Sequence, residues 1–308
     1  MLDSFKISAT GLSMYYLPEY VAEANGYFEE VGIKKSSYVP EPWTTVLTDI
    51  DSGAYQAVIG GLWLPIIYSG RCKDYKVFCR MASRSPMALV SRKPLEKPFS
   101  WKDLEGKVTL CAGAHSIGGG VIVGGCAREA GCDMSKVKIT HDFYGSMLLD
   151  LFKGGMGDYM LTKAENGILM EQRGEAYLAT QLCESAGVCP HSVYYATQKV
   201  LDENLDLFCR FTLAVQKGFD WIKTHDAYDC REVISSNWPN VDQKVELRVA
   251  ELFRASGMWG DNVALTQEEF DRWQRMIRDE TFTIDVPRAY DDVVDSRPFQ
   301  YVKETHGL

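Results

Sequence analysis

Short apolar runs alternate with amphipathic segments through the first two thirds of the sequence. The runs have the length of buried strands, and the segments between them carry apolar residues at spacings of three and four, as helices do. The pattern predicts strands at 5–9, 33–39, 56–60, 75–81, 86–90, 107–112, 136–141, 157–161 and 192–197. It predicts helices at 16–30, 43–51, 63–70, 117–131, 145–153 and 163–172. Such alternation indicates an α/β fold with mainly parallel sheets.

The pattern changes at about residue 204, where strands cease. Long amphipathic helices are predicted at roughly 205–225, 242–256 and 266–280. The first of them carries a single apolar stripe, which indicates packing against a core rather than a cofactor site. The stripe consists of Leu207, Phe211, Ala214, Val215 and Phe219.

Two polar interruptions divide the α/β part of the chain. The segment 91–100, with prolines at 94 and 98, is expected to be a surface connection. The second interruption is 184–190, just before the strand predicted at 192–197. Two passages of the chain between two lobes are expected at these positions.

The charge and apolar content exclude two classes of partner. The 308 residues carry a formal net charge of −9 without clustered Lys and Arg, so a nucleic-acid surface is not expected. No window reaches the roughly 18 uninterrupted apolar residues of a membrane helix, so membrane insertion is not expected.

Cysteine usage and the N-terminus bear on the compartment. The nine cysteines are odd in number and never spaced as CxxC, which predicts neither a disulfide framework nor a zinc ribbon. The first residues lack a basic segment followed by an apolar run, as a secretory signal would have. A cytoplasmic location is therefore favoured. The alternative is a periplasmic protein numbered after removal of its signal.

The stretch CAGAHSIGGG (111–120) places small residues between a predicted strand and a predicted helix. Backbone N–H groups near Ser116 and Ile117 would be unpaired at such a helix start and would suit an anion or a polar ligand group. His115 would lie beside them as a ligand contact, since no second histidine stands at metal spacing. Ser116 as a simple N-cap is the alternative.

Six segments, in this order along the chain, resemble one known family. It joins the sulfonate-, taurine- and nitrate-binding proteins with the thiamine-pyrimidine synthases and their precursor-binding relatives. The segments are YYLPEYVAEANGYFEEVGI (15–33), LTDIDSGAYQAVIGG (47–61), WKDLEGKVTLCAGAHS (101–116), LFKGGMGDYML (151–161), SVYYATQKVLDENLDLFCRF (192–211) and YDDVVD (290–295). Together they span nearly the whole chain.

The resemblance implies a two-lobed type II periplasmic-binding-protein-like α/β fold with two crossing hinge segments. Lobe one would combine residues 1–86 and 195–308, and lobe two would be residues 92–188. The hinges would lie near 87–91 and 189–194. A ligand would bind in the cleft between the lobes, beyond the carboxyl ends of the strands.

Candidate binding residues follow from that rule, and each has a structural alternative. Glycines let the backbone approach a ligand and aromatic rings hold flat ligands, although such residues also form turns and cores. An arginine can neutralise a ligand acid or form a salt bridge. Thr162 can contact the ligand or cap the following helix, with Glu165 as capping-box partner. The candidates are Leu12, Ser13, Tyr15, Trp43, Gly60, Gly61, Trp63, Arg80, His115, Ser116, Ile117, Tyr144 and Thr162.

Enzymes of the family provide a test for catalysis. The pyrimidine synthase has a cofactor-binding lysine where this chain has Gly60, and the related desulfinases have a cysteine near the position of Ser13. A serine without an activating base is a weak nucleophile. The remaining catalytic candidates are Cys189 with His191, and His115, against a structural role for the thiol.

Two functions are compatible with these residues. The first is binding of a small anionic or aromatic molecule, such as a sulfonate, carboxylate or pyrimidine, by a solute-binding protein that would serve an ABC-transporter permease if exported. The alternative is a cytoplasmic enzyme on the same fold, either related to thiamine-pyrimidine synthesis or a desulfinase- or decarboxylase-like lyase. Enzyme status stays open, and neither a cofactor nor a metal is expected.

Overall fold

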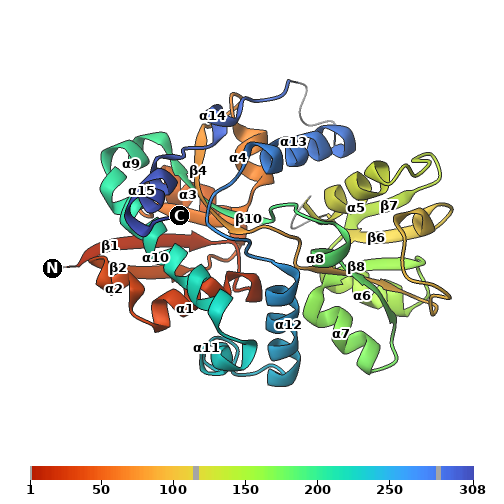
Figure 1. The fold of residues 1–308 in the computed structure, drawn as a ribbon. Coiled ribbons are helices and arrows are strands. Elements are labelled where there is room, and N and C mark those ends of the chain that lie inside the picture. Colours follow the sequence, from red (N-terminus) through yellow and green to blue (C-terminus); the bar gives the residue numbers. More distant parts are fainter. Residues whose placement is uncertain (1, 114–117, 282–285) are drawn as a thin grey trace. The chain divides into compact units, whose positions relative to one another are not determined.

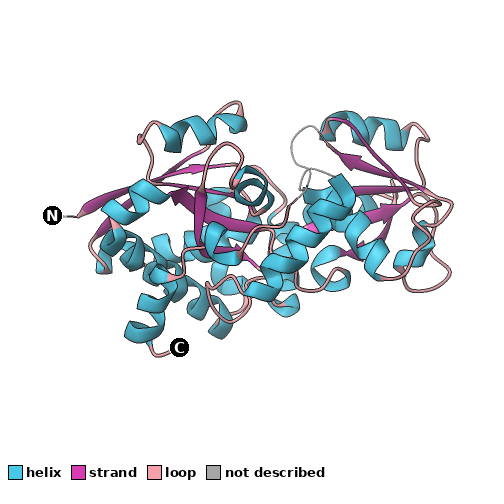
Figure 2. Ribbon diagram, turned by 90° about the horizontal axis from the view of Figure 1, so that it is seen from above, coloured by secondary structure: helices cyan, strands magenta, loops and turns pink. Residues whose placement is uncertain are grey.

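The computed structural model describes residues 2–113, 118–281 and 286–308, and the chain forms two compact units (Figure 1). Each unit is built on its own five-stranded sheet with helices packed beside it (Figure 2). Unit 1 comprises Met1–Ser83, Pro190–Asp271 and Val286–Leu308. Unit 2 comprises Arg84–Cys189 and Arg272–Asp285.

The sheet of unit 1 has the order β2-β1-β3-β10-β4. Strand β1 runs parallel to β2 and β3, whereas β10 runs antiparallel to β3 and β4. The strands are β1 (Asp3–Ala9), β2 (Ile33–Tyr38), β3 (Ala57–Gly61), β4 (Tyr75–Ala82) and β10 (Ser192–Thr197).

The sheet of unit 2 has the order β7-β6-β8-β5-β9. Strand β6 runs parallel to β7 and β8, whereas β5 runs antiparallel to β8 and β9. The strands are β5 (Met87–Ser91), β6 (Val108–Ala112), β7 (Lys138–Phe143), β8 (Tyr159–Lys163) and β9 (Tyr177–Gln181).

Helices fill the segments between the strands. Those that lie wholly in unit 1 are η1 (Met14–Tyr16), α1 (Leu17–Ala24), α2 (Tyr27–Glu30), η2 (Trp43–Thr45), α3 (Val46–Asp51), α4 (Trp63–Tyr68), α9 (Gln198–Glu203), α10 (Leu205–Thr224), η4 (Ala227–Cys230), α11 (Arg231–Asn237), α12 (Gln243–Ser256), α14 (Tyr290–Val293) and α15 (Arg297–His306). Those in unit 2 are η3 (Trp101–Leu104), α5 (Gly118–Glu129), α6 (Gly145–Lys153), α7 (Ala164–Gln172) and α8 (Leu182–Ser185). Helix α13 (Gln267–Thr281) begins in unit 1 and ends in unit 2.

The α/β fold predicted from the sequence is confirmed, with one correction. The prediction of mainly parallel sheets was wrong, because β10 and β5 each enter their sheet antiparallel to both neighbours. Strand β9 was not predicted, since most of its residues are exposed or half-buried and give no apolar run. The helix expected at 16–30 is divided at Gly26, which has a left-handed φ of 72°.

One passage between the units lies within the expected hinge 189–194, whereas the other precedes the expected hinge 87–91. The chain leaves unit 1 between Ser83 and Arg84 and returns between Cys189 and Pro190. Residues 87–91, expected as a hinge, form strand β5 inside the sheet of unit 2, and residues 192–194 belong to β10 in unit 1. A further segment, Arg272–Asp285, joins unit 2 through contacts such as Arg272 with Glu129 at 2.7 Å.

Aromatic residues of α10 pack against the sheet of unit 1. Phe5 of β1 stacks on Phe211 at 4.2 Å between ring centroids, and Phe208 meets the Phe5 ring edge-on at 5.2 Å. Of the stripe predicted for this helix, Phe211, Ala214, Val215 and Phe219 are fully buried. The stripe is therefore core, and no cofactor site is needed to explain it.

The core of unit 2 is a separate apolar cluster. It joins the sheet to the helices α6 and α7. Its buried members are Val90, Leu110, Leu148, Phe152, Met160, Met170 and Ala176.

Gly218 allows helix α10 to approach helix α1 closely. A Cβ on Gly218 would lie 2.1 Å from the carbonyl oxygen of Pro18 and 3.2 Å from Cβ of Ala22. We expect Gly218→Ala to lower the free energy of unfolding by about 1–3 kcal/mol, because the helix backbones must separate and the gain in helix propensity is smaller. Urea unfolding checks this.

Gly145→Ala is the matched control, because nothing lies within 4 Å of a Cβ at Gly145. Its unfolding free energy should change by less than about 0.5 kcal/mol. Equal midpoints for both variants would contradict the close approach of the two helices.

Candidate functional site

The candidate functional site lies at one edge of the sheet of unit 1. Strands β1 and β3 are parallel, with Ala9 opposite Ile59, so their carboxyl ends meet at this edge. The antiparallel β10 begins at the same edge, where Ser192 is opposite both Gly61 of β3 and Ala82 of β4. Three loops distant in sequence are thereby brought together.

The loop after β1 carries three predicted site residues. Leu12 is exposed, whereas Ser13 and Tyr15 are half-buried. Ser13 precedes helix η1 in an extended conformation, and its side chain caps nothing. The indole Nε1 of Trp259 donates a hydrogen bond of 2.9 Å to the carbonyl oxygen of Tyr15 and so fixes this loop.

The end of β3 brings Gly60, Gly61 and Trp63 to the same edge. A Cβ on Gly61 would lie 2.4 Å from Nε1 of Trp63, so the indole ring rests directly on the Gly61 backbone. A Cβ on Gly60 would lie 2.8 Å from Cγ2 of Thr10. Close packing requires a glycine at both positions. From the sequence alone, a tight turn was an equally good explanation for the two glycines.

His191 precedes β10 and faces Tyr15. The two rings meet edge-on, with centroids 5.3 Å apart. The side chain is partly exposed, yet its Nδ1 is buried and has no hydrogen-bond partner. Burial lowers the pKa of His191 to about 4, because the charged imidazolium is poorly solvated there. The ring is therefore neutral at pH 7 and has one nitrogen to offer.

Hydroxyl groups surround the same strand ends. The Tyr16 hydroxyl lies 3.4 Å from Oγ of Ser192 and 3.5 Å from Oγ1 of Thr10. The buried hydroxyl of Tyr195 has no partner and would be 3.6 Å from a Cβ on Gly60. These hydroxyl groups place polar atoms near the strand ends that precede the half-buried Tyr15 and Trp63.

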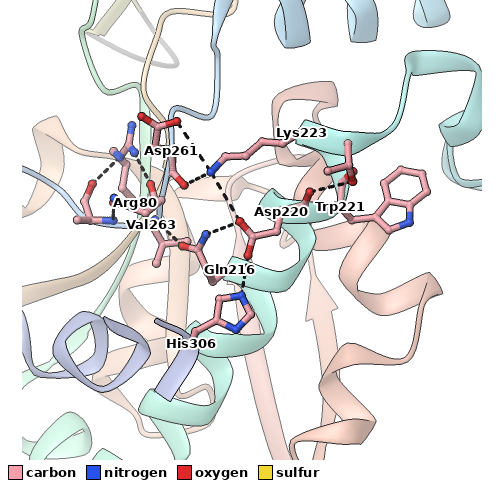
Figure 3. A network of polar contacts seen from close by, with 11 residues as sticks. Arg80, Gln216, Asp220, Trp221, Lys223, Asp261, Val263 and His306 are labelled. Carbon is pink, nitrogen blue, oxygen red and sulfur yellow. Dashed lines mark hydrogen bonds and ion pairs between the residues drawn. The ribbon is translucent and has the colours of Figure 1, made fainter. Parts of the chain in front are cut away.

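Arg80 is not available to a ligand acid, which corrects the prediction. Its guanidinium is buried, with Nη1 3.4 Å from the carboxylate of Glu269, Nε donating to the carbonyl of Ala264, and Nη2 donating to that of Asn262. The surrounding network (Figure 3) continues through Gln216 to Asp220. Arg80 thus anchors the loop before α13. Of the two roles considered for this arginine, the structure shows the salt bridge, and the pair is buried.

Trp43 follows the outermost strand of the sheet of unit 1. It opens helix η2 just after β2, which pairs only with β1. Its side chain is half-buried.

The candidates of unit 2 form a second group. Tyr144 is 53% exposed and precedes α6. Thr162 lies within β8 and accepts a hydrogen bond from Asn166, while Lys163 holds the N-cap position of α7 without a side-chain cap. The capping role considered for Thr162 and Glu165 was therefore wrong. His115, Ser116 and Ile117 lie outside the described residues.

Cys189 occupies a structural position. It is fully buried, and its Sγ lies 3.9 Å from Sδ of Met276. His191 belongs to unit 1, whereas Cys189 belongs to unit 2. The ring of Tyr15 is the aromatic neighbour of His191, and the pairing of Cys189 with His191 considered for catalysis stays a prediction.

Several site residues were not predicted from the sequence. Thr10, Tyr16, Ser192 and Trp259 support the edge through hydrogen bonds. The signal for Thr10 and Ser192 was their place at a strand end, but the antiparallel entry of β10 was needed to bring them together. Across the described ranges, no group of three or more histidine, cysteine or acidic side chains could hold a metal.

Comparisons with known proteins agree with this fold. A model of the NMT1/THI5-like family matches residues 13–227. "Putative binding protein YtlA" of Bacillus subtilis is 24% identical over 282 residues, covering 90% of this chain and 83% of that protein.

Solved structures are similar over the whole chain. The periplasmic sulfonate-binding protein SsuA of Methylobacillus flagellatus has a TM-score of 0.75 and 15% identity, covering 100% of this chain and 96% of that one. The desulfurization enzyme DSZB has a TM-score of 0.65 and 12% identity, covering 99% of each chain.

The chain has the two-lobed α/β fold of the periplasmic binding proteins. It belongs to the NMT1/THI5-like family, as the resemblance of its sequence segments predicted. In the part of the chain that the structure describes, no helix combines the length and apolarity needed to cross a membrane.

Proposed function

We propose that the chain binds a small molecule at the edge of unit 1 formed by the ends of β1 and β3 and the start of β10. The observation that carries the proposal is the contact of Tyr15 with His191 beside the glycine-lined end of β3, where the ring of Trp63 rests on Gly61. Half-buried rings offer flat apolar contact, and a neutral imidazole with a partnerless nitrogen offers one directional hydrogen bond. Such sites hold carboxylates, sulfonates or heteroaromatic rings.

Binding without chemistry is the function we favour. YtlA and SsuA are named as binding proteins, and the proposed site has no activated nucleophile among its described residues. Ser13 lies in the loop where related desulfinases carry cysteine, but the structure gives its hydroxyl no base within hydrogen-bond distance. An enzyme like DSZB is therefore the second candidate.

The partner we propose is the permease of an ABC transporter. The SsuA relative is named as periplasmic, which fits the exported alternative better than the cytoplasmic location that the sequence favoured. Co-purification with the membrane-embedded permease in the presence of ligand supports this role. Retention of the native protein in the cytoplasm of its source cells would exclude it.

A thermal-shift screen of sulfonates, carboxylates and pyrimidines tests the binding function. A ligand that binds only the folded chain raises the melting temperature, and the stabilisation grows with the logarithm of the ligand concentration above Kd. A compound that binds and is also consumed would establish an enzyme. Absence of any shift across all three classes would contradict the proposed function.

Trp63→Ala and Gly61→Ala should weaken binding of the strongest compound from that screen by about tenfold or more. The first removes the indole, and the second displaces it, because the new Cβ would occupy the position 2.4 Å from Nε1 of Trp63. Isothermal titration calorimetry of both variants measures the effect.

Tyr228→Ala is the control, since Tyr228 is an exposed aromatic residue of unit 1 in η4. Its affinity should equal that of the wild type. If both site variants bind with wild-type affinity, Trp63 does not contact the ligand.

A further inference from the structure

Gln181 is a buried glutamine whose side chain makes no hydrogen bond. It ends strand β9 of unit 2 and is 4% exposed, and both Nε2 and Oε1 of its amide are buried without a partner. Leaving a buried amide unpaired is unfavourable, so such atoms in native proteins normally meet a partner.

The same chain satisfies a comparable glutamine completely. Gln216 is fully buried in α10, where its Oε1 accepts from the N–H of Val263 and its Nε2 donates to Asp220 (Figure 3). Gln181 differs from Gln216, because neither atom of its amide has a partner among the described residues.

Further unsatisfied polar atoms lie at the same end of the unit 2 sheet. Gln181 is opposite Ala88 of β5, and the residues just before β5 include Arg84 and Ser85. Arg84 reaches back toward Gln181, because its Nη1 donates a 3.0 Å hydrogen bond to the carbonyl of Cys183. The Nε of Arg84 and the Oγ of Ser85 are both buried without partners.

The charge of Arg84 is also uncompensated in the described part of unit 2. No carboxylate forms an ion pair with its guanidinium there, whereas the buried Arg80 of unit 1 faces Glu269. The cluster thus offers a cationic donor at Arg84, an amide donor and an amide acceptor at Gln181, and a hydroxyl at Ser85.

We propose that Arg84, Ser85 and Gln181 form a polar subsite that takes a ligand with an acidic group beside an N–H or O–H donor, such as an amino- or hydroxy-substituted carboxylate. The acidic group accepts from Nε of Arg84 and Nε2 of Gln181. The neighbouring donor pairs with Oε1 of Gln181. A sulfonate has acceptors only and would leave Oε1 unpaired.

The first arm of the test uses the ligand-free protein and does not depend on the proposed function. Gln181→Met removes the unpaired amide and keeps the side-chain length, so we expect its melting temperature to rise by about 2–4 °C. Gln216→Met, which breaks two hydrogen bonds, should melt lower than the wild type, and Gln172→Met, at an exposed position, should not change. A lower melting temperature for Gln181→Met would show that a water or protein group already satisfies the amide, and would overturn the subsite.

The second arm compares three probes, 2-aminobenzoate, benzoate and benzenesulfonate, by isothermal titration calorimetry. The subsite predicts that 2-aminobenzoate binds about tenfold tighter than benzoate in the wild type, and that this difference vanishes in Gln181→Met. Equal affinities for the three probes, or no binding by any of them, would overturn the ligand class.

The subsite goes beyond the proposed function, because Arg84, Ser85 and Gln181 all belong to unit 2. Gln181→Met tests only this subsite, whereas Trp63→Ala tests only the site of unit 1. Loss of the difference between 2-aminobenzoate and benzoate in Gln181→Met supports the subsite whatever Trp63→Ala does. An unchanged difference in Gln181→Met overturns the subsite and leaves the unit 1 site to its own test.

Discussion

Replacement of Arg80 by methionine should lower the free energy of unfolding by about 3–5 kcal/mol. The side chains of Arg80 and Glu269 are 5% and 10% exposed, so the variant leaves a carboxylate buried without its counter-ion. It also leaves the carbonyls of Asn262 and Ala264 without their donor. Chemical denaturation at pH 7 measures the loss.

Two further variants identify the cause. Arg210→Met removes an arginine whose partners Asp3 and Asp206 are exposed, and should change stability by less than about 1 kcal/mol. The double variant Arg80→Met/Glu269→Gln should recover part of the loss, because the unpaired charge is gone. Similar stability for Arg80→Met and Arg210→Met would contradict the buried pair.

Stability should fall as the pH decreases from about 6.5 to about 4, because of His191. Burial lowers the pKa of His191 to about 4 in the folded chain, whereas an unfolded histidine has a pKa near 6.5. Between these values the unfolded state binds a proton that the folded state excludes, so each step down in pH favours unfolding. The difference integrates to about 3 kcal/mol. Above pH 6.5 this contribution is complete.

His191→Gln isolates that contribution, since other groups also titrate in this range. The difference in unfolding free energy between wild type and variant should change with pH only between about 6.5 and 4. His225→Gln, which removes another imidazole of unit 1, shows what the loss of a histidine alone does to stability at a fixed pH. Parallel pH profiles for wild type and His191→Gln would show that the imidazole is not desolvated.

Local pattern was sufficient to predict most elements and the family. Strand–turn–helix order placed the glycines of β3 and the first aromatic residues at strand ends. The antiparallel entry of β10 could not be predicted, because its apolar run is the same in either direction. The antiparallel entry places His191 beside Tyr15, so the contact between these two side chains could not be predicted from the sequence.

The roles of single polar residues were the least predictable. Arg80 and Thr162 stand near strand ends, where the sequence predicts ligand contacts, yet Arg80 is paired with Glu269 from a distant helix. Gln181 gave no signal at all, since its significance lies in the hydrogen bonds it does not make. Burial and pairing depend on tertiary contacts, which the local pattern does not contain.

The most direct test of the proposed binding site is a crystal structure of the chain with the strongest compound from the thermal-shift screen. The account predicts density for the ligand in contact with Tyr15, Trp63 and His191. Density located elsewhere, with these three side chains contacting only protein or solvent, would contradict it.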